Sequence, residues 1–447
     1  AEAESRGEVF EAEGGWPLLR VEGGVVDVPF PAEGIERLRR SPEEVRVVLF
    51  GLGRGNTFRT LRAHGVHVAA IYEPDPGVAR RFFEQGPSDL GETPLVTVLS
   101  DLENVWLQVT GDSTQIELVE TPGYRVAFPE ARSELIARIG RLLERTLIND
   151  DTLGIRGRTW IQDVLDNLPY LRSPSAHHLA GRFKGVPAFI VGAGPSLSQN
   201  VAELEEATAR GIVFAVNSSG KALDRAGVRP QAFGCLESID VSHLFRDLSF
   251  IDDVVRIASF TAHPHVLQTG QGPLLTLYEH LPYIAPPFER FFDAPGMPVC
   301  ASVTTALVAL AVRMGCSPVV LVGQDLAYSG GRCYASGTVY EDSRVAVGSD
   351  GTLKHEWCET MVETHEAAGS HLIQGEPVEF VKAWGGEGQV PSVASFIQVR
   401  MWLERVALLL ARSEGDLELV NATEGGAHVH GFADRKLRQV LDELPLR

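Results

Sequence analysis

The clearest chemical signal in the sequence is a glycine-rich turn at residues 192–197. It contains Gly192, Ala193, Gly194, Pro195, Ser196 and Leu197, and it lies between an apolar run and a helical pattern. Glycine permits a tight turn and close approach to a ligand, proline fixes φ at the start of a helix, and the serine can cap the helix or donate to a phosphate. A turn of this kind before a helix can cradle a phosphate. Taken alone, it fits an ordinary strand-to-helix connection equally well.

Polar residues also follow three other apolar runs of the same region. Asn217 follows residues 212–216, Glu237 and Asp240 follow residues 231–236, and Gln324 and Asp325 follow residues 319–322. In an open α/β sheet, ligands bind beyond the carboxyl ends of the strands. We therefore expect these residues to meet the 192–197 turn at one cleft. The structural alternatives are a turn-forming asparagine and an aspartate, Asp240, that caps a helix.

The elements that must position these residues form an α/β pattern over residues 187–330. Strands are predicted at 188–191, 212–216, 231–236, 254–260 and 319–322, and helices at 200–210, 221–226 and 303–314. Strands that alternate with helices of this length predict a mostly parallel sheet. Residues 187–330 are therefore expected to be a nucleotide-binding α/β core.

A second α/β pattern lies nearer the N-terminus. A strand at 45–50, a turn at 51–55 with glycines at 51, 53 and 55, a helix at 56–64 and a strand at 66–72 lead to Glu73. This is the general layout of a dinucleotide or S-adenosylmethionine pocket, although the glycine spacing differs from G-x-G-x-x-G. A Rossmann-like scaffold that binds nothing is the alternative reading.

The fold class predicted is thus α/β, with two Rossmann-like domains, mostly parallel sheets and a helical C-terminal region. Residues 1–40 are expected to form a small hairpin appendage, residues 331–390 a long loop or lid, and residues 392–412 and 433–444 helices. The predicted domains are 1–150 (appendage and Rossmann-like domain), 151–183 (helical linker), 184–390 (central domain) and 391–447 (helical region).

Composition limits the kinds of partner. The chain has 59 acidic and 40 basic residues, a formal net charge of −19, and 44% hydrophobic residues, as expected for a globular protein. Nucleic-acid binders use clustered Lys and Arg, so a nucleic-acid partner is not expected. A run of about 18 apolar residues, which a membrane span would need, is absent.

Several kinds of site are also disfavoured. The five cysteines are widely spaced without C-x-x-C, which argues against a disulfide framework and a zinc cluster and favours a reducing cytoplasm. No P-loop or G-x-S-x-G motif occurs. His263 and His265 follow a predicted strand, where one of them could serve as a general base. The alternative is that both are ordinary loop histidines.

Beside these patterns, the sequence resembles the motility-associated factor (Maf) glycosyltransferase family. The resemblance rests on residues 191–197, on 215–218 with Asn217 and Ser218, on 323–328 with Gln324 and Asp325, on 421–427, and on 156–160. It extends over nearly the whole chain. The central domain is similar to bacterial sialyltransferases with an α/β fold.

This resemblance implies a cytoplasmic enzyme that moves a nonulosonic acid, pseudaminic or legionaminic, from a CMP-sugar to Ser or Thr of flagellin. It implies that Gly192, Gly194, Pro195, Ser196 and Asn217 contact CMP, and we add Leu197, Ser218 and Gln324 to the nucleotide site. Asp325 and Glu237 are the candidates for positioning the acceptor or serving as the base, and Tyr334 is the candidate for a hydrogen bond to the phosphate or the glycosidic oxygen. No metal or other cofactor is expected.

The sequence departs from the family pattern at two places. Ala193 stands where the sialyltransferases often have Asn, and Tyr334 stands before 335–337 where many relatives have His. Two other functions remain open. The superfamily includes an archaeal 6-hydroxymethyl-dihydropterin diphosphokinase, which would need Mg²⁺. A flagellin-binding scaffold without activity is the non-enzymatic alternative.

Overall fold

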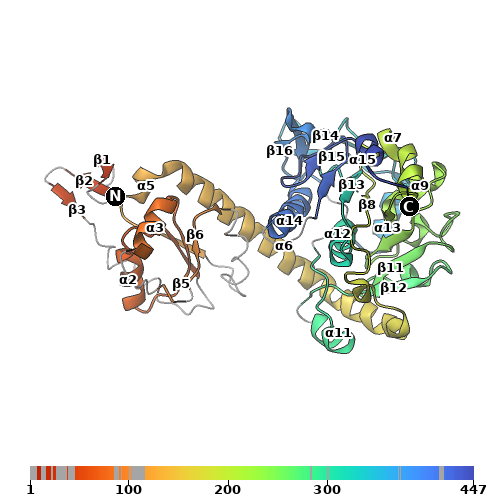
Figure 1. Ribbon diagram of the computed structural model, residues 1–447, viewed down its shortest axis with the longest axis horizontal. Coiled ribbons are helices and arrows are strands. Elements are labelled where there is room, and N and C mark those ends of the chain that lie inside the picture. Colours follow the sequence, from red (N-terminus) through yellow and green to blue (C-terminus); the bar gives the residue numbers. More distant parts are fainter. Residues whose placement is uncertain are drawn as a thin grey trace. The chain divides into compact units, whose positions relative to one another are not determined.

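In the computed structural model, the protein consists of two compact units, Ala1–Ile155 and Arg156–Arg447 (Figure 1). It describes residues 8–11, 17–21, 24–26, 38, 46–84, 90–91, 93–99, 102, 116–281, 284–299, 302–370, 372, 374–411 and 417–446. In the described part of the chain, no helix combines the length and apolarity needed to cross a membrane.

The first unit contains a small parallel sheet in the order β6-β5-β4-β7. Its strands are β4 (Arg46–Phe50), β5 (Val68–Tyr72), β6 (Leu95–Val96) and β7 (Ile116–Glu120), with helices α2 (Asn56–Ala63) and α3 (Pro76–Glu84). The central strands β4 and β5 are almost entirely buried because apolar side chains from both faces of the sheet pack into separate cores. The predicted strand, turn, helix and strand are confirmed.

The N-terminal appendage is an antiparallel sheet of β1 (Glu8–Glu11), β2 (Pro17–Val21) and β3 (Gly24–Val26). The hairpin predicted there corresponds to β2 and β3. A short helix, α5 (Tyr124–Ala127), and a long one, α6 (Pro129–Asn167), follow the first parallel sheet. The division between the two units falls within α6. The domain boundaries predicted near residues 183 and 390 stay predictions.

The second unit is built on a parallel sheet in the order β12-β11-β10-β9-β8-β13-β18-β19. Every pair of neighbouring strands is parallel, so the predicted mostly parallel α/β fold is confirmed. The strands are β8 (Ala188–Val191), β9 (Ile212–Val216), β10 (Ala232–Cys235), β11 (Val255–Ser259), β12 (Leu274–Leu277), β13 (Val319–Val322), β18 (Leu419–Asn421) and β19 (Ala433–Asp434).

Helices cover both faces of this sheet, where two apolar cores lie. They include α7 (Leu197–Asn200), α8 (Leu204–Thr208), α9 (Gly220–Arg225), α10 (Pro264–Gln268) and α12 (Val303–Met314). Helix α11 (Ala285–Phe292) packs in a separate, smaller core with Phe260 and Tyr278. The predicted helix at 200–210 is instead a series of short helical segments. The bounds predicted for β13 and α12 are confirmed.

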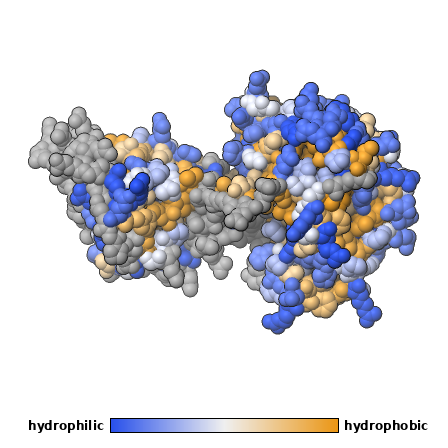
Figure 2. Space-filling model, in the orientation of Figure 1, coloured by the Kyte–Doolittle hydropathy of each residue, from blue (hydrophilic) through white to orange (hydrophobic). Residues whose placement is uncertain are grey.

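The prediction of a long loop or lid at 331–390 is wrong. This region contains two antiparallel hairpins and a helix, which are β14 (Arg344–Val347) with β15 (Leu353–Glu356), α13 (Glu359–Ala367), and β16 (Glu379–Lys382) with β17 (Gln389–Ser392). Each strand is short and carries exposed polar residues, so its apolar periodicity is weak. On the face seen in Figure 2, hydrophilic residues cover much of the surface around β14–β16 and α15.

The C-terminal region is only partly helical. Helix α14 (Ala394–Ala411) confirms the amphipathic helix predicted at 392–412. The helix predicted at 433–444 begins later, as α15 (Leu437–Glu443), because Ala433 and Asp434 extend the sheet as β19. The side chain of Asn421 on β18 donates to the Asp434 carboxylate at 3.1 Å and joins the two strands.

Candidate active site

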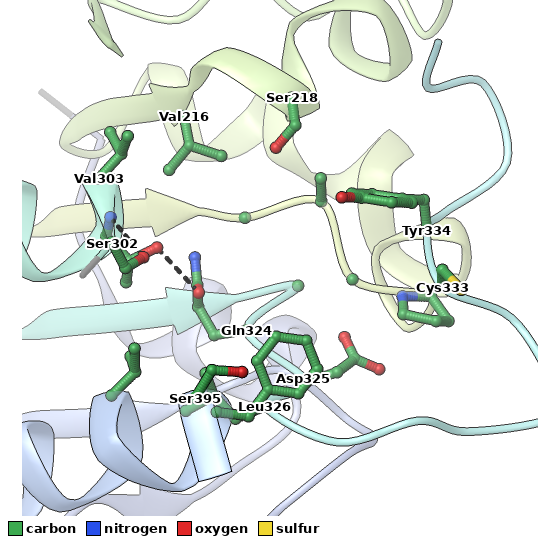
Figure 3. Close-up of a pocket in the computed structure, with 18 of the residues that line it drawn as sticks. Val216, Ser218, Ser302, Val303, Gln324, Asp325, Leu326, Cys333, Tyr334 and Ser395 are labelled. Carbon is green, nitrogen blue, oxygen red and sulfur yellow. Dashed lines mark hydrogen bonds between the residues drawn. The ribbon is translucent and has the colours of Figure 1, made fainter. Parts of the chain in front are cut away.

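A cavity of about 360 Å³ lies at the carboxyl ends of β8, β9, β10 and β13, within the second unit (Figure 3). Of the predicted site residues, Ser196 and Leu197 do not line it, and all the others do: Gly192, Gly194, Pro195, Asn217, Ser218, Glu237, Gln324, Asp325 and Tyr334. The structure therefore brings together residues that are far apart in the sequence.

The 192–197 turn is fixed by hydrogen bonds within the protein. The N–H of Gly192 donates to the carbonyl of Val322 at 2.8 Å, and that of Gly194 to the carbonyl of Gly323 at 2.9 Å. The N–H of Leu197 donates back to the Gly194 carbonyl at 3.0 Å. These three N–H groups are therefore already paired within the protein, and a phosphate cradle at this turn stays a prediction. The turn is a rigid wall of the cavity, braced against the end of β13.

The same contact explains the two glycines. A Cβ atom at Gly192 would overlap the side-chain amide of Gln324, and one at Gly194 would overlap the Asp325 carboxylate. Neither glycine has the left-handed backbone that favours this residue. Gly192 and Gly194 therefore give room to the loop that follows β13.

Asp325 is a buried partner of Ser196. The hydroxyl of Ser196 donates to Asp325 Oδ2 at 2.6 Å, and its N–H donates to Oδ1 at 3.2 Å. Asp325 is only 3% exposed. Burial raises the pKa of Asp325 to about 6, although the hydrogen bonds from Ser196 act in the opposite direction. The predicted helix cap is not made by the Ser196 side chain, which is used here instead.

The pKa of Asp325 leads to a prediction about stability. Because its pKa is higher in the folded protein than in the unfolded chain, the folded state binds the proton more tightly. This contribution to stability is complete at low pH and is lost as the pH rises toward 6. The difference in unfolding free energy between Asp325→Asn and the wild type is therefore expected to change with pH. Between pH 4 and pH 7.5 it should shift in favour of the variant by up to about 3 kcal/mol. Urea unfolding at both pH values measures this gain, and a pH-independent difference would contradict it.

Gln324 joins the turn to helix α12. Its Oε1 accepts a hydrogen bond from Thr304 Oγ1 at 2.9 Å, and its backbone N–H donates to Thr423 Oγ1 at 3.3 Å. Its Nε2 is buried and has no hydrogen-bond partner among the described residues. Figure 3 shows this amide between the start of α12 and the end of β8. An unpaired buried donor is costly unless a ligand or water accepts from it.

The N-terminus of α12 opens on the same cavity. Ser302 caps this helix by accepting from Thr304 N at 3.2 Å, and Ser302, Val303 and Thr304 line the cavity. The positive end of a helix dipole favours an anion. The sequence signal for this cap was a serine before an apolar helix, but the sequence alone did not show that the helix points at the cleft.

Asn217 and Ser218 lie at the end of β9. Asn217 is 7% exposed, and its side chain has no hydrogen-bond partner among the described residues. The hydroxyls of Ser218 and Tyr334 point into the cavity in Figure 3. Burial raises the pKa of Tyr334, so its hydroxyl remains protonated and able to donate. These groups provide uncharged donors beside the α12 N-terminus.

Glu237 is an acidic group open to the cavity. Its side chain is accessible from the cavity, although protein surrounds it, and burial raises its pKa while the charge of Arg156 lowers it. A carboxylate with a raised pKa suits proton transfer near neutral pH. Unlike Asp325, Glu237 accepts no side-chain hydrogen bond from a described residue. It is therefore the better placed of the two candidate bases.

Sequence reasoning missed a group of aromatic residues at the cavity. Tyr328, Trp357 and Phe396 line it. The hydroxyl of Tyr328 lies 3.2 Å from Nε2 of His355, whose ring stacks on Trp357 at 4.4 Å. Trp357 belongs to the region predicted as a loop, which explains why no pattern indicated it. These rings offer surfaces on which a base or a sugar can pack.

The segment 421–427 holds the backbone of Gln324 and Asp325 in place. Ala427 N donates to the Asp325 carbonyl at 2.7 Å, and Thr423 holds the backbone of Gln324. Gly323 and Leu326 have φ of 64° and 47°, so the chain turns sharply on both sides of Gln324 and Asp325. A left-handed leucine is strained by about 1–2 kcal/mol. Such strain persists where the surrounding structure imposes it, often at a functional site.

The glycine-rich turn of the first unit is filled by its own protein. The ring of Tyr124 occupies the space where a Cβ atom of Gly51 would lie. Its hydroxyl donates to Glu73 Oε2 at 2.7 Å, and Glu73 also accepts from Leu52 N at 2.9 Å and Asp75 N at 3.0 Å. Glu73, the acid expected to bind a ribose, thus already accepts hydrogen bonds from within the protein. Of the two readings left open, this favours a scaffold without a ligand.

Comparison with known proteins agrees with this architecture. Residues 162–331 match the family described as 6-hydroxymethylpterin diphosphokinase MptE-like. A solved structure, the Maf glycosyltransferase from Magnetospirillum magneticum AMB-1, is similar with a TM-score of 0.54 and 14% sequence identity. The match covers 99% of this chain and 71% of that one. The resemblance to Maf proteins extends to the fold. No curated protein matches the sequence significantly.

Proposed function

We propose that this protein is a glycosyltransferase that moves a nonulosonic acid from a CMP-sugar to Ser or Thr of flagellin. The observation that carries this proposal is the chemistry of the cavity. None of the described residues that line it is Lys or Arg, whereas a helix N-terminus and uncharged donors converge there. The phosphodiester of a CMP-sugar has a single negative charge, which neutral donors can bind.

The reaction proposed is an inverting displacement. The acceptor oxygen forms a bond to the anomeric carbon as the bond from that carbon to the CMP phosphate oxygen breaks. The proton of the acceptor hydroxyl passes to Glu237, or to Asp325 if its contact with Ser196 opens. The leaving phosphate accepts hydrogen bonds from Tyr334, Ser218 and Gln324 Nε2 near the α12 N-terminus. Donors fixed in advance stabilise developing charge most effectively.

A diphosphokinase is the second candidate, since residues 162–331 match a family of that description. Mg²⁺ bridging ATP phosphates needs carboxylate or other oxygen ligands. Of the two carboxylates at the cavity, Asp325 is already held by Ser196. The described lining residues also include no Lys or Arg, so only the Mg²⁺ itself would offset the charge of a triphosphate. The site therefore fits a CMP-sugar better, and no metal is expected to be needed.

Ligand-dependent stability tests this choice of nucleotide. A ligand at 100 times its Kd stabilises the folded state by about 2.7 kcal/mol. We expect CMP and CMP-nonulosonic acids to raise the melting temperature without Mg²⁺, and ATP with Mg²⁺ or S-adenosylmethionine to have no effect. Asn217→Ala is expected to weaken CMP binding about tenfold by removing a buried hydrogen bond. Asn56→Ala, in the first unit, is the matched control.

Flagellin modification tests the transfer itself. Flagellin co-expressed with the protein and a source of the CMP-sugar is expected to gain the mass of the sugar, with Glu237→Gln reducing that gain. Stabilisation by ATP with Mg²⁺ alone would favour the diphosphokinase. Tight flagellin binding with no change in flagellin mass would favour the scaffold.

A further inference from the structure

A cluster of three metal-ligating side chains lies outside the residues that line the cavity. It consists of Asp240, His263 and His265, each of which has a ligand atom within 4.8 Å of those of the other two. Asp240 follows β10, and the two histidines follow β11, the neighbouring parallel strand. The carboxyl edge of the sheet therefore brings together residues that are more than 20 positions apart.

Backbone hydrogen bonds fix the position of His263 and the Asp240 carboxylate. His263 N donates to the Glu237 carbonyl at 2.8 Å, and Pro264 begins α10 directly after it. Asp240 Oδ1 accepts from Ser242 N at 3.0 Å. Ligands that are fixed before binding lose little entropy when a metal ion arrives.

The cluster leaves suitable atoms for a metal ion. His263 Nδ1 accepts from His265 N at 3.3 Å, which leaves Nε2 of His263 as its ligand atom. Asp240 Oδ2 lies 2.7 Å from His265 Nδ1. His265 and Asp240 are exposed, so an ion could enter from solvent and retain open positions.

From this geometry we propose that Asp240, His263 and His265 bind a divalent transition-metal ion of the zinc type. Imidazole nitrogens select zinc, copper or nickel, whereas magnesium prefers oxygen ligands. Two histidines and one carboxylate are also the protein ligands of many zinc sites that keep an open position. This site is independent of the proposed glycosyl transfer.

The simpler reading is an ion pair beside a helix cap. The chain contains two other pairs of that kind among its described residues, His280 with Glu289 at 3.3 Å and His428 with Asp434 at 2.6 Å. Neither belongs to a cluster of three such ligands. Because His280 and Glu289 are not joined by a second histidine, His280→Ala is a matched control.

Zinc binding to the full-length chain, prepared without a histidine tag, tests the proposal. Titration with Zn²⁺ is expected to show one site that His263→Ala and Asp240→Asn weaken at least about tenfold, the size of effect seen when groups around a metal are removed. His280→Ala should bind like the wild type, and excess Mg²⁺ should not displace the Zn²⁺. The melting temperature without metal identifies any variant that fails to fold.

Two results would overturn the proposal. One is zinc affinity in folded His263→Ala and Asp240→Asn that equals that of the wild type. The other is a wild-type protein that binds no Zn²⁺, or that releases it to Mg²⁺. Because this titration uses neither CMP nor flagellin, its outcome does not depend on the proposed transferase activity.

Discussion

Gly194→Ala is expected to destabilise the second unit and to weaken nucleotide binding. The new Cβ atom would overlap the Asp325 carboxylate and lie 2.9 Å from the Gly323 carbonyl oxygen. Overpacking of a buried site costs about 1–3 kcal/mol, or more where backbone atoms must move. Here the groups that must move are the wall of the cavity and the loop that carries Gln324. We therefore expect a loss of at least about tenfold in CMP affinity.

The matched control for this change is Gly157→Ala. Gly157 lies within α6, and its added Cβ atom would meet nothing within 4 Å. Alanine is favoured over glycine in a helix by about 1 kcal/mol, so this variant should be as stable as the wild type or more so. Thermal unfolding and CMP titration of both variants provide the measurement. A Gly194→Ala protein with normal stability and affinity would show that the turn is not packed as described.

Gln324→Glu is expected to have the largest effect on donor binding with the smallest change in shape. It replaces the unpaired buried amide nitrogen with a carboxylate oxygen at the N-terminal end of α12. Two negative charges placed close together across a binding site cost several kcal/mol, and each 1.4 kcal/mol is a factor of ten in affinity. CMP binding should therefore fall by at least about a hundredfold.

Gln231→Glu supplies the control for the added charge. Gln231 precedes β10, at the opposite end of that strand from the cavity, and its Oε1 accepts from Val213 N at 2.8 Å. A carboxylate can still accept this bond, so CMP affinity should stay close to the wild-type value. Calorimetric titration compares the three proteins. Equal affinity in Gln324→Glu and the wild type would place the phosphate elsewhere in the cavity.

Local patterns predicted the central elements well. Strand β13 is a continuous apolar run and helix α12 is largely apolar, and both have clear ends, so their bounds could be read directly from the sequence. Strands β18 and β19 could not, because they are three and two residues long and depend on pairing with strands distant in the sequence. Short strands of this kind gain their stability from tertiary context rather than from intrinsic propensity.

The membership of the candidate site was predictable in part, whereas its hydrogen bonds were not. The rule that ligands lie beyond the carboxyl ends of strands brought Asn217, Glu237 and Gln324 together correctly. That rule does not state which atoms pair, so the contact of Asp325 with Ser196, 129 residues earlier, emerged only from the structure. The same limit applies to Tyr124, which fills the first glycine-rich turn from 51 residues beyond Glu73.

The described residues that line the cavity include no Lys or Arg, and this has a consequence for how a donor arrives. Screening by salt weakens attraction between separated charges, but hydrogen-bond donors and a helix end act only at short range. With a net charge of −19 on the whole chain, long-range forces repel an anionic sugar nucleotide rather than guide it. Capture therefore depends on close encounter, and a rise in ionic strength should speed association while leaving the lifetime of the complex almost unchanged.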